Sequence, residues 1–116
     1  MTRKVSADEF KRFIDQTNRQ LIAVLFYAKY LPGNEDMLKT LESMDRMFNH
    51  SVDFFTVDVD EEYNLKKASN LTHFPSLVFF KPSEYQPIHV VHGSLSGREL
   101  SAGINDLLIK LANTKV

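Results

Sequence analysis

Two groups of side chains have residue types and spacing that could bind a metal. His89 and His92 are close in sequence, but on a predicted strand their side chains would point to opposite faces, and no third ligand is identifiable. The acidic run Asp58 to Glu62 fails the calcium-loop pattern, because Tyr63 and Ser69 stand where glycine and glutamate are needed. These carboxylates are expected to begin a helix and to stay solvated. We therefore predict neither a metal nor a cofactor.

The chain contains no cysteine among its 116 residues. This excludes disulfides, thiolate metal sites and cysteine nucleophiles together. A possible carboxylate pair, Glu35 and Asp36, follows Asn34 at the start of a predicted helix. Asparagine is a strong N-cap and acidic residues suit the first turn of a helix. We interpret this segment as a cap rather than as an acid–base pair.

Composition predicts one ordinary globular domain, residues 1–116, with a mass of 13.4 kDa. The net charge of −1 gives no electrostatic reason to expect nucleic acid or an anionic membrane as a partner. The longest apolar stretch, Leu21 to Ala28, is too short to span a bilayer. We expect a monomer or weak dimer in the cytoplasm. Two glycosylation sequons, at Asn49 and Asn70, keep a domain of a secretory-pathway protein open as the alternative.

Hydrophobic periodicity and turn signals divide the chain into alternating strands and helices. "SADE", from Ser6 to Glu9, is a capping box that begins the first helix. "LIAVLFY", from Leu21 to Tyr27, is apolar at every position, as a strand covered on both faces must be. The remaining strands are expected at 3–5, a short edge strand, and at 52–59, 76–81 and 88–92. The remaining helices are expected at 34–48, 61–69 and 97–111.

This order predicts an α/β fold, βαβαβαββα, with a mixed central sheet and helices on both of its faces. The two strands on either side of "PSEYQP" are expected to pair as an antiparallel hairpin. Right-handed crossovers would join the first three strands.

Four short segments of the chain are "VLFYAKY", "FFTVDVDEE", "THFPSLVFF" and "VVHGSLS". In their order and separations they resemble the thioredoxin family, and the resemblance extends from Lys4 to Leu111. It implies the thioredoxin fold, with Tyr30 in the position of the family's tryptophan. It also implies a cis peptide bond at Phe74-Pro75 and a glycine, Gly93, that closes the fifth strand.

The departures from the family pattern concern its reactive groups. The Cys-Gly-Pro-Cys turn of the family falls on Leu31, Pro32, Gly33 and Asn34, and its buried aspartate falls on Leu25. Thiol–disulfide exchange needs an attacking thiolate and a resolving thiol, and leucine and asparagine supply neither. We therefore expect a redox-inactive protein that is not an enzyme.

The resemblance further implies an inherited groove for a protein or an extended peptide segment. In thioredoxins the residue before the cis-proline pairs its main chain with the substrate, which is strand addition and needs no sulfur. The implied groove residues are Tyr30, Leu31, Pro32, Gly33, Asn34, His73, Phe74, Pro75 and Gly93. The alternative is that the cis-proline loop is architectural and that Leu31 is an incidental exposed apolar residue.

Two other functions within the same fold are considered. Non-catalytic domains of larger disulfide isomerases resemble this cysteine-less pattern. A glutathione-binding protein is the other alternative, but Ser83-Glu84 has the reverse order of the acidic-serine pair found in glutathione-using relatives. We also expect no extra helical domain of the kind that glutathione-using relatives have. A non-catalytic binding or scaffold module is the leading interpretation.

Overall fold

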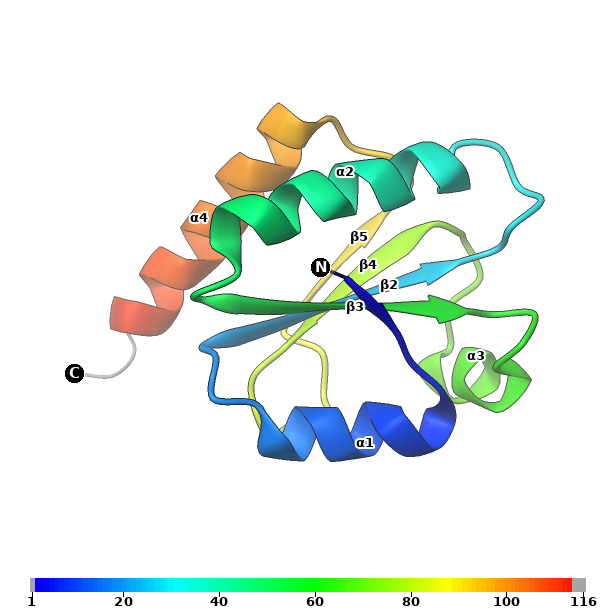
Figure 1. Cartoon of the computed structure of the whole chain (residues 1–116), viewed down its shortest axis with the longest axis horizontal. Helices are drawn as coiled ribbons and strands as arrows, with labels where there is room; N and C mark the ends of the chain where they lie inside the picture. Colours follow the sequence, from blue (N-terminus) through cyan, green and yellow to red (C-terminus); the bar gives the residue numbers. More distant parts are fainter. Residues whose placement is uncertain (1, 114–116) are drawn as a thin grey trace.

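The computed structural model describes residues 2–113 and has one mixed five-stranded sheet between two layers of helices (Figure 1). The strand order is β1-β3-β2-β4-β5. β1, β2 and β3 are parallel to one another, whereas β4 runs antiparallel to β2 and β5 runs antiparallel to β4. The strands are β1 Arg3–Lys4, β2 Leu21–Tyr27, β3 Val52–Asp58, β4 Ser76–Phe80 and β5 His89–His92. The helices are α1 Ala7–Gln16, α2 Asn34–Phe48, α3 Tyr63–Ser69 and α4 Gly97–Asn113.

The central strand β2 is buried along its whole length, as its continuous apolar sequence predicts. Alternate residues of a strand face opposite sides of the sheet. Leu21, Ala23 and Leu25 therefore pack in the core formed with α2 and α4. Ile22 and Val24 pack in the second core, which α1 and α3 cover on the other side of the sheet. The predicted fold class and the antiparallel β4–β5 pair are confirmed.

The predicted capping box at the start of α1 is present. The main-chain N–H of Glu9 donates to Ser6 Oγ at 3.3 Å, and the N–H of Ser6 donates to Glu9 Oε1 at 3.1 Å. These reciprocal bonds satisfy two donors that a helix start otherwise leaves without partners.

The acidic segment after β3 differs from its prediction. Asp58 is buried rather than solvated, and its Oδ1 accepts the main-chain N–H groups of Asp60 at 2.9 Å and Glu61 at 3.3 Å. It therefore closes the turn that leaves the sheet, and α3 begins only at Tyr63. None of the helices within residues 2–113 is long and apolar enough to cross a lipid bilayer.

Candidate functional site

The turn between β2 and α2 lies at the carboxyl end of β2 and presents apolar side chains to solvent. The Tyr30 side chain is 89% exposed and Leu31 is 46% exposed. Gly33 has a φ of +83°, and a Cβ built on it would lie 2.6 Å from Ser94 Oγ. Any larger residue at this position would therefore be strained and would also displace Ser94.

Asn34 has a different role from the predicted N-cap. Gly33 is the N-cap residue of α2, and Asn34 is fully buried as the first residue of the helix. Its Oδ1 accepts the N–H of Ala28 at 2.8 Å, and its Nδ2 donates to the carbonyls of Leu31 at 3.2 Å and Pro32 at 3.3 Å. The N-cap prediction is therefore wrong, because the amide holds the preceding turn instead of the helix start.

The loop before β4 has the predicted cis peptide bond between Phe74 and Pro75. Pro75 is buried, and its carbonyl accepts the N–H of Gly93 at 2.8 Å. Phe74 is half-buried, with the Lys66 ammonium 5.5 Å from the centre of its ring. Within residues 2–113, neither the main-chain N–H nor the C=O of Phe74 forms a hydrogen bond. This leaves one donor and one acceptor of the main chain open to a partner.

Hydrogen bonds join this loop to the turn. Ser94 Oγ donates to the carbonyl of Gly33 at 3.1 Å, and the neighbouring residue Gly93 is bonded to Pro75. The end of β5 therefore bridges the turn and the cis-proline loop. A shallow cavity of about 330 Å³ lies over the turn, and Phe74 and Pro75 are outside it. Its lining consists of Lys29, Tyr30, Leu31, Pro32, Gly33, Glu35 and Asp36.

Two residues beside the loop, Ser76 and His92, have a pairing that the sequence alone did not indicate. They stand opposite each other in the β4–β5 register, and Ser76 Oγ lies 2.8 Å from His92 Nδ1. The ring of His73 lies 5.7 Å from that of His92, measured between centroids. Only the register of the two strands could have revealed this cluster.

His89 lies on the opposite face of β5 from His92, as predicted. The His89 ring is 6.0 Å from the ring of Phe79, which is its partner in the register. Within the described part of the chain, no group of three or more histidine, aspartate and glutamate side chains is arranged to hold a metal ion.

Two ionisable side chains near the carboxyl ends of the parallel strands, Tyr27 and Lys4, have raised pKa values. Burial, reinforced by the nearby charge of Asp58, raises the pKa of Tyr27, so its phenol stays neutral at neutral pH. A bond to Glu61, 2.6 Å away, raises the pKa of Lys4. Neither side chain is a nucleophile under these conditions.

The Ser83-Glu84 pair lies far from the cis-proline loop. The N–H of Ser83 donates to the carbonyl of Ile14 at 2.9 Å, and β4 extends between this connector and Pro75. The acidic-serine pair considered for glutathione is therefore not brought to the groove.

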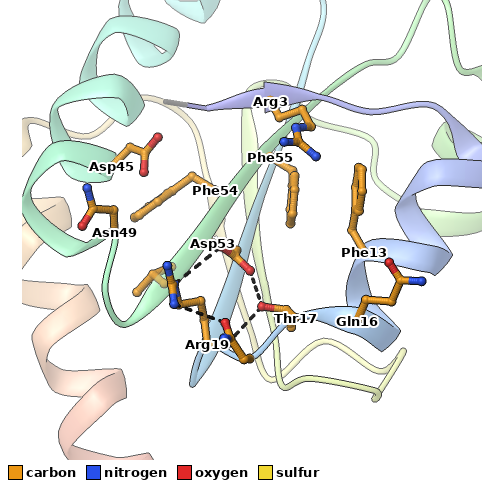
Figure 2. A pocket seen from close by; sticks show the side chains of 12 residues that line it. Arg3, Phe13, Gln16, Thr17, Arg19, Asp45, Asn49, Asp53, Phe54 and Phe55 are labelled. Carbon is orange, nitrogen blue, oxygen red and sulfur yellow. Dashed lines mark hydrogen bonds and ion pairs between the residues drawn. The ribbon is translucent and has the colours of Figure 1, made fainter.

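A larger cavity, of about 510 Å³, lies at the amino end of β3 and thus at the opposite end of that strand from Asp58 (Figure 2). Thr17 donates a hydrogen bond to Asp53, and Arg19 forms an ion pair with Asp53 at 3.9 Å. The Arg3 guanidinium lies 5.0 Å from the centre of the Phe13 ring. Thr17 and Arg19 thus both contact Asp53, and none of the predicted site residues lines this cavity.

Comparison with known sequences identifies one family. The family model for thioredoxin matches residues 1–106. Curated relatives include the chloroplastic thioredoxin-like protein CITRX of rice, Oryza sativa subsp. indica and subsp. japonica. Each is 26% identical over 84 residues, which cover 72% of this chain and 44% of the relative. The match thus spans less than half the length of those proteins.

Solved structures with similar folds are also thioredoxins or are connected with them. Plasmodium falciparum thioredoxin superposes with a TM-score of 0.78 at 22% identity, covering 91% of this chain and 98% of the other, which shows the fold. Malassezia sympodialis thioredoxin gives 0.77 at 25% identity, with coverages of 91% and 90%. A third structure comes from work on the thiol resolving mechanism in yeast mitochondrial 1-Cys peroxiredoxin via the glutathione and thioredoxin systems. It superposes with a TM-score of 0.75 at 26% identity, covering 91% of this chain and 94% of the other.

Proposed function

The chain belongs to the thioredoxin family, and we propose that it is a redox-inactive member that binds an extended segment of a partner protein. The binding surface is the cis-proline groove, which we define as residues 30–33, 73–75 and 93. Asn34 lies buried beneath this surface and supports it.

The absence of disulfide chemistry follows from the residues at the reactive positions. Leu31 and Asn34 carry no sulfur, and the chain has no cysteine elsewhere. Leu25 is fully buried in the apolar core, so no carboxylate there serves a proton transfer. Thiol–disulfide exchange requires two sulfur atoms that act one after the other, first an attacking thiolate and then a resolving thiol.

The open main-chain groups of Phe74 are the observation that carries the proposal. A bound segment that lies alongside Phe74 would accept its N–H and donate to its C=O, as an added strand does. Buried main-chain N–H and C=O groups are nearly always paired in folded proteins, and Phe74 is a half-buried residue. An unpaired donor and acceptor on one residue, beside exposed apolar groups, therefore favour a partner.

The exposed side chains of the turn would supply the apolar contacts. Tyr30 combines a large apolar ring with a hydroxyl, and residues of this type are enriched at the energetic centres of protein interfaces. Leu31 projects an aliphatic group where a family enzyme would present its sulfur. Binding here would proceed without turnover.

A peptide-binding experiment tests this proposal. Immobilised wild-type protein would select binders from a displayed library of random peptides, and calorimetry would measure their affinities. We expect Leu31→Asp to weaken binding about tenfold or more, which corresponds to roughly 1.4 kcal/mol. Ile109→Asp is the matched control, because Ile109 is an exposed aliphatic residue, 59% accessible, near the end of α4. Equal losses in both variants, or none in either, would contradict groove binding.

A further inference from the structure

The side chain of Ser76 lies between two histidines at the edge of the cis-proline groove. Ser76 is fully buried, and its Oγ is 2.5 Å from the carbonyl oxygen of His73 and 2.8 Å from Nδ1 of His92. Both contacts are within hydrogen-bond distance, so one hydroxyl group serves two partners.

The Ser76 hydroxyl has a single proton, and this determines which ring nitrogen of neutral His92 is protonated. A serine hydroxyl has one proton to donate, and a carbonyl oxygen can only accept. The short contact with the His73 carbonyl therefore uses the hydroxyl proton. Ser76 Oγ must then accept from the imidazole, so His92 Nδ1 carries a proton. In the neutral ring this leaves the lone pair on Nε2.

The ring of His92 lies beside His73, a residue of the groove. His92 is exposed, directly precedes Gly93, and stands opposite Ser76, the residue that follows Pro75. Its ring is 5.7 Å from the ring of His73, which precedes Phe74. Within residues 2–113, no hydrogen bond involves Nε2 of His92.

We propose that Ser76 positions His92 so that its Nε2 accepts a hydrogen bond from a hydroxyl or amide group of the bound segment. This inference rests on the proposed function and adds a chemical preference to it. The Lys66 ammonium next to Phe74 disfavours a cationic donor nearby, so the preferred donor is uncharged. Ser76 is a positioning residue and His92 is the residue that determines specificity.

Nuclear magnetic resonance tests the positioning step without any partner. Long-range proton–nitrogen spectra distinguish the two neutral tautomers of a histidine ring. We expect wild-type His92 to be protonated on Nδ1 and Ser76→Ala to lose this preference. His89, whose ring faces Phe79 instead, is the internal reference in the same spectra. A wild-type His92 protonated mainly on Nε2 would overturn the inference, whatever the protein binds.

A hydroxyl-for-methyl exchange in the ligand tests the recognition step. Peptides selected on the wild-type protein would be compared as threonine and valine pairs, which have nearly the same shape. At one position of the peptide, the wild-type protein should bind the threonine version about fivefold more tightly than the valine version, or by a larger factor. His92→Phe should abolish this preference, and His89→Phe, on the opposite face of β5, should keep it.

The outcomes separate this inference from the proposed function. Peptides that bind through Leu31 but show the same threonine preference in His92→Phe as in the wild type would overturn the inference alone. A protein that binds no peptide of the library would contradict groove binding and the recognition step together, while the spectra would still decide the tautomer.

Discussion

The Oδ1 atom of Asn34 accepts the main-chain N–H of Ala28 across the β2–α2 turn, at 2.8 Å. The same amide donates to the carbonyls of Leu31 and Pro32. Asn34 occupies the position of the second cysteine in the Cys-Gly-Pro-Cys turn that the family resemblance aligns with this segment. Here an amide holds the turn through three hydrogen bonds, so the shape of the site is maintained without sulfur.

Replacing this amide should destabilise the protein. Asn34→Ala leaves the Ala28 N–H and the Pro32 carbonyl without their partners, while the Leu31 carbonyl keeps only the main-chain N–H of residue 34. A buried group left unpaired costs about 1–3 kcal/mol. Urea denaturation followed by circular dichroism measures the loss. The control is Asn49→Ala, an exposed asparagine at the end of α2, which we expect to change stability by less than about 0.5 kcal/mol. Equal stability of the two variants would show that the Asn34 bonds contribute little.

Restoring the family's buried carboxylate should be costly in this core. Leu25 is fully buried and packs between the sheet and the α2–α4 layer. Leu25→Asp should reduce the free energy of unfolding by at least about 3 kcal/mol at neutral pH. Burial raises the pKa of a carboxyl group, so this loss should shrink as the pH falls and the group becomes neutral.

Leu25→Asn separates charge from size in the same experiment. The asparagine variant should be destabilised too, but its deficit should not depend on pH. Parallel pH profiles for the aspartate and asparagine variants would mean that the introduced carboxylate is hydrated rather than buried.

The capping box at α1 predicts a pH dependence of stability. Bonds from the main chain and side chain of Ser6 lower the pKa of Glu9 from its ordinary value of 4.5. Because the pKa is lower in the folded state, ionised Glu9 stabilises the protein at every pH above its unfolded-state pKa. This contribution is lost as the pH falls through the folded-state pKa. The stability gap between wild type and Glu9→Gln should therefore be present at pH 7 and close in acid.

Thermal unfolding between about pH 3 and pH 7 measures this gap. Glu35→Gln is a suitable comparison, because Glu35 also lies in the first turn of its helix and is exposed there. A gap for Glu9→Gln that does not narrow in acid would rule out the carboxylate as its source.

The elements that the sequence predicts well are those with a strong local pattern. The uniform apolar run of β2 and the "SADE" capping box both have the expected structures. The mixed sheet with helices on both faces follows from the alternation of elements together with the family resemblance. Such features depend on spacing within a few residues, which a single sequence displays directly.

Features that depend on the path of the folded backbone in a turn, or on the register of two strands, were missed. Asparagine is a common N-cap, but the preceding turn folds back over Asn34 and uses its amide for other bonds. The burial of Asp58 is tolerated because two following N–H groups donate to its carboxylate. The Ser76–His92 pair exists only because the β4–β5 register places these residues opposite each other.

The most direct test of the central claim follows the Phe74 amide during binding. Nitrogen-labelled protein would be titrated with a library-selected peptide, and amide shifts and hydrogen-exchange rates would be recorded. We predict that the Phe74 amide shifts and exchanges more slowly when the peptide is bound, together with shifts at Leu31 and Gly93, because its free N–H gains a partner. A saturating peptide that leaves the Phe74 amide unchanged while shifting residues elsewhere would contradict the account.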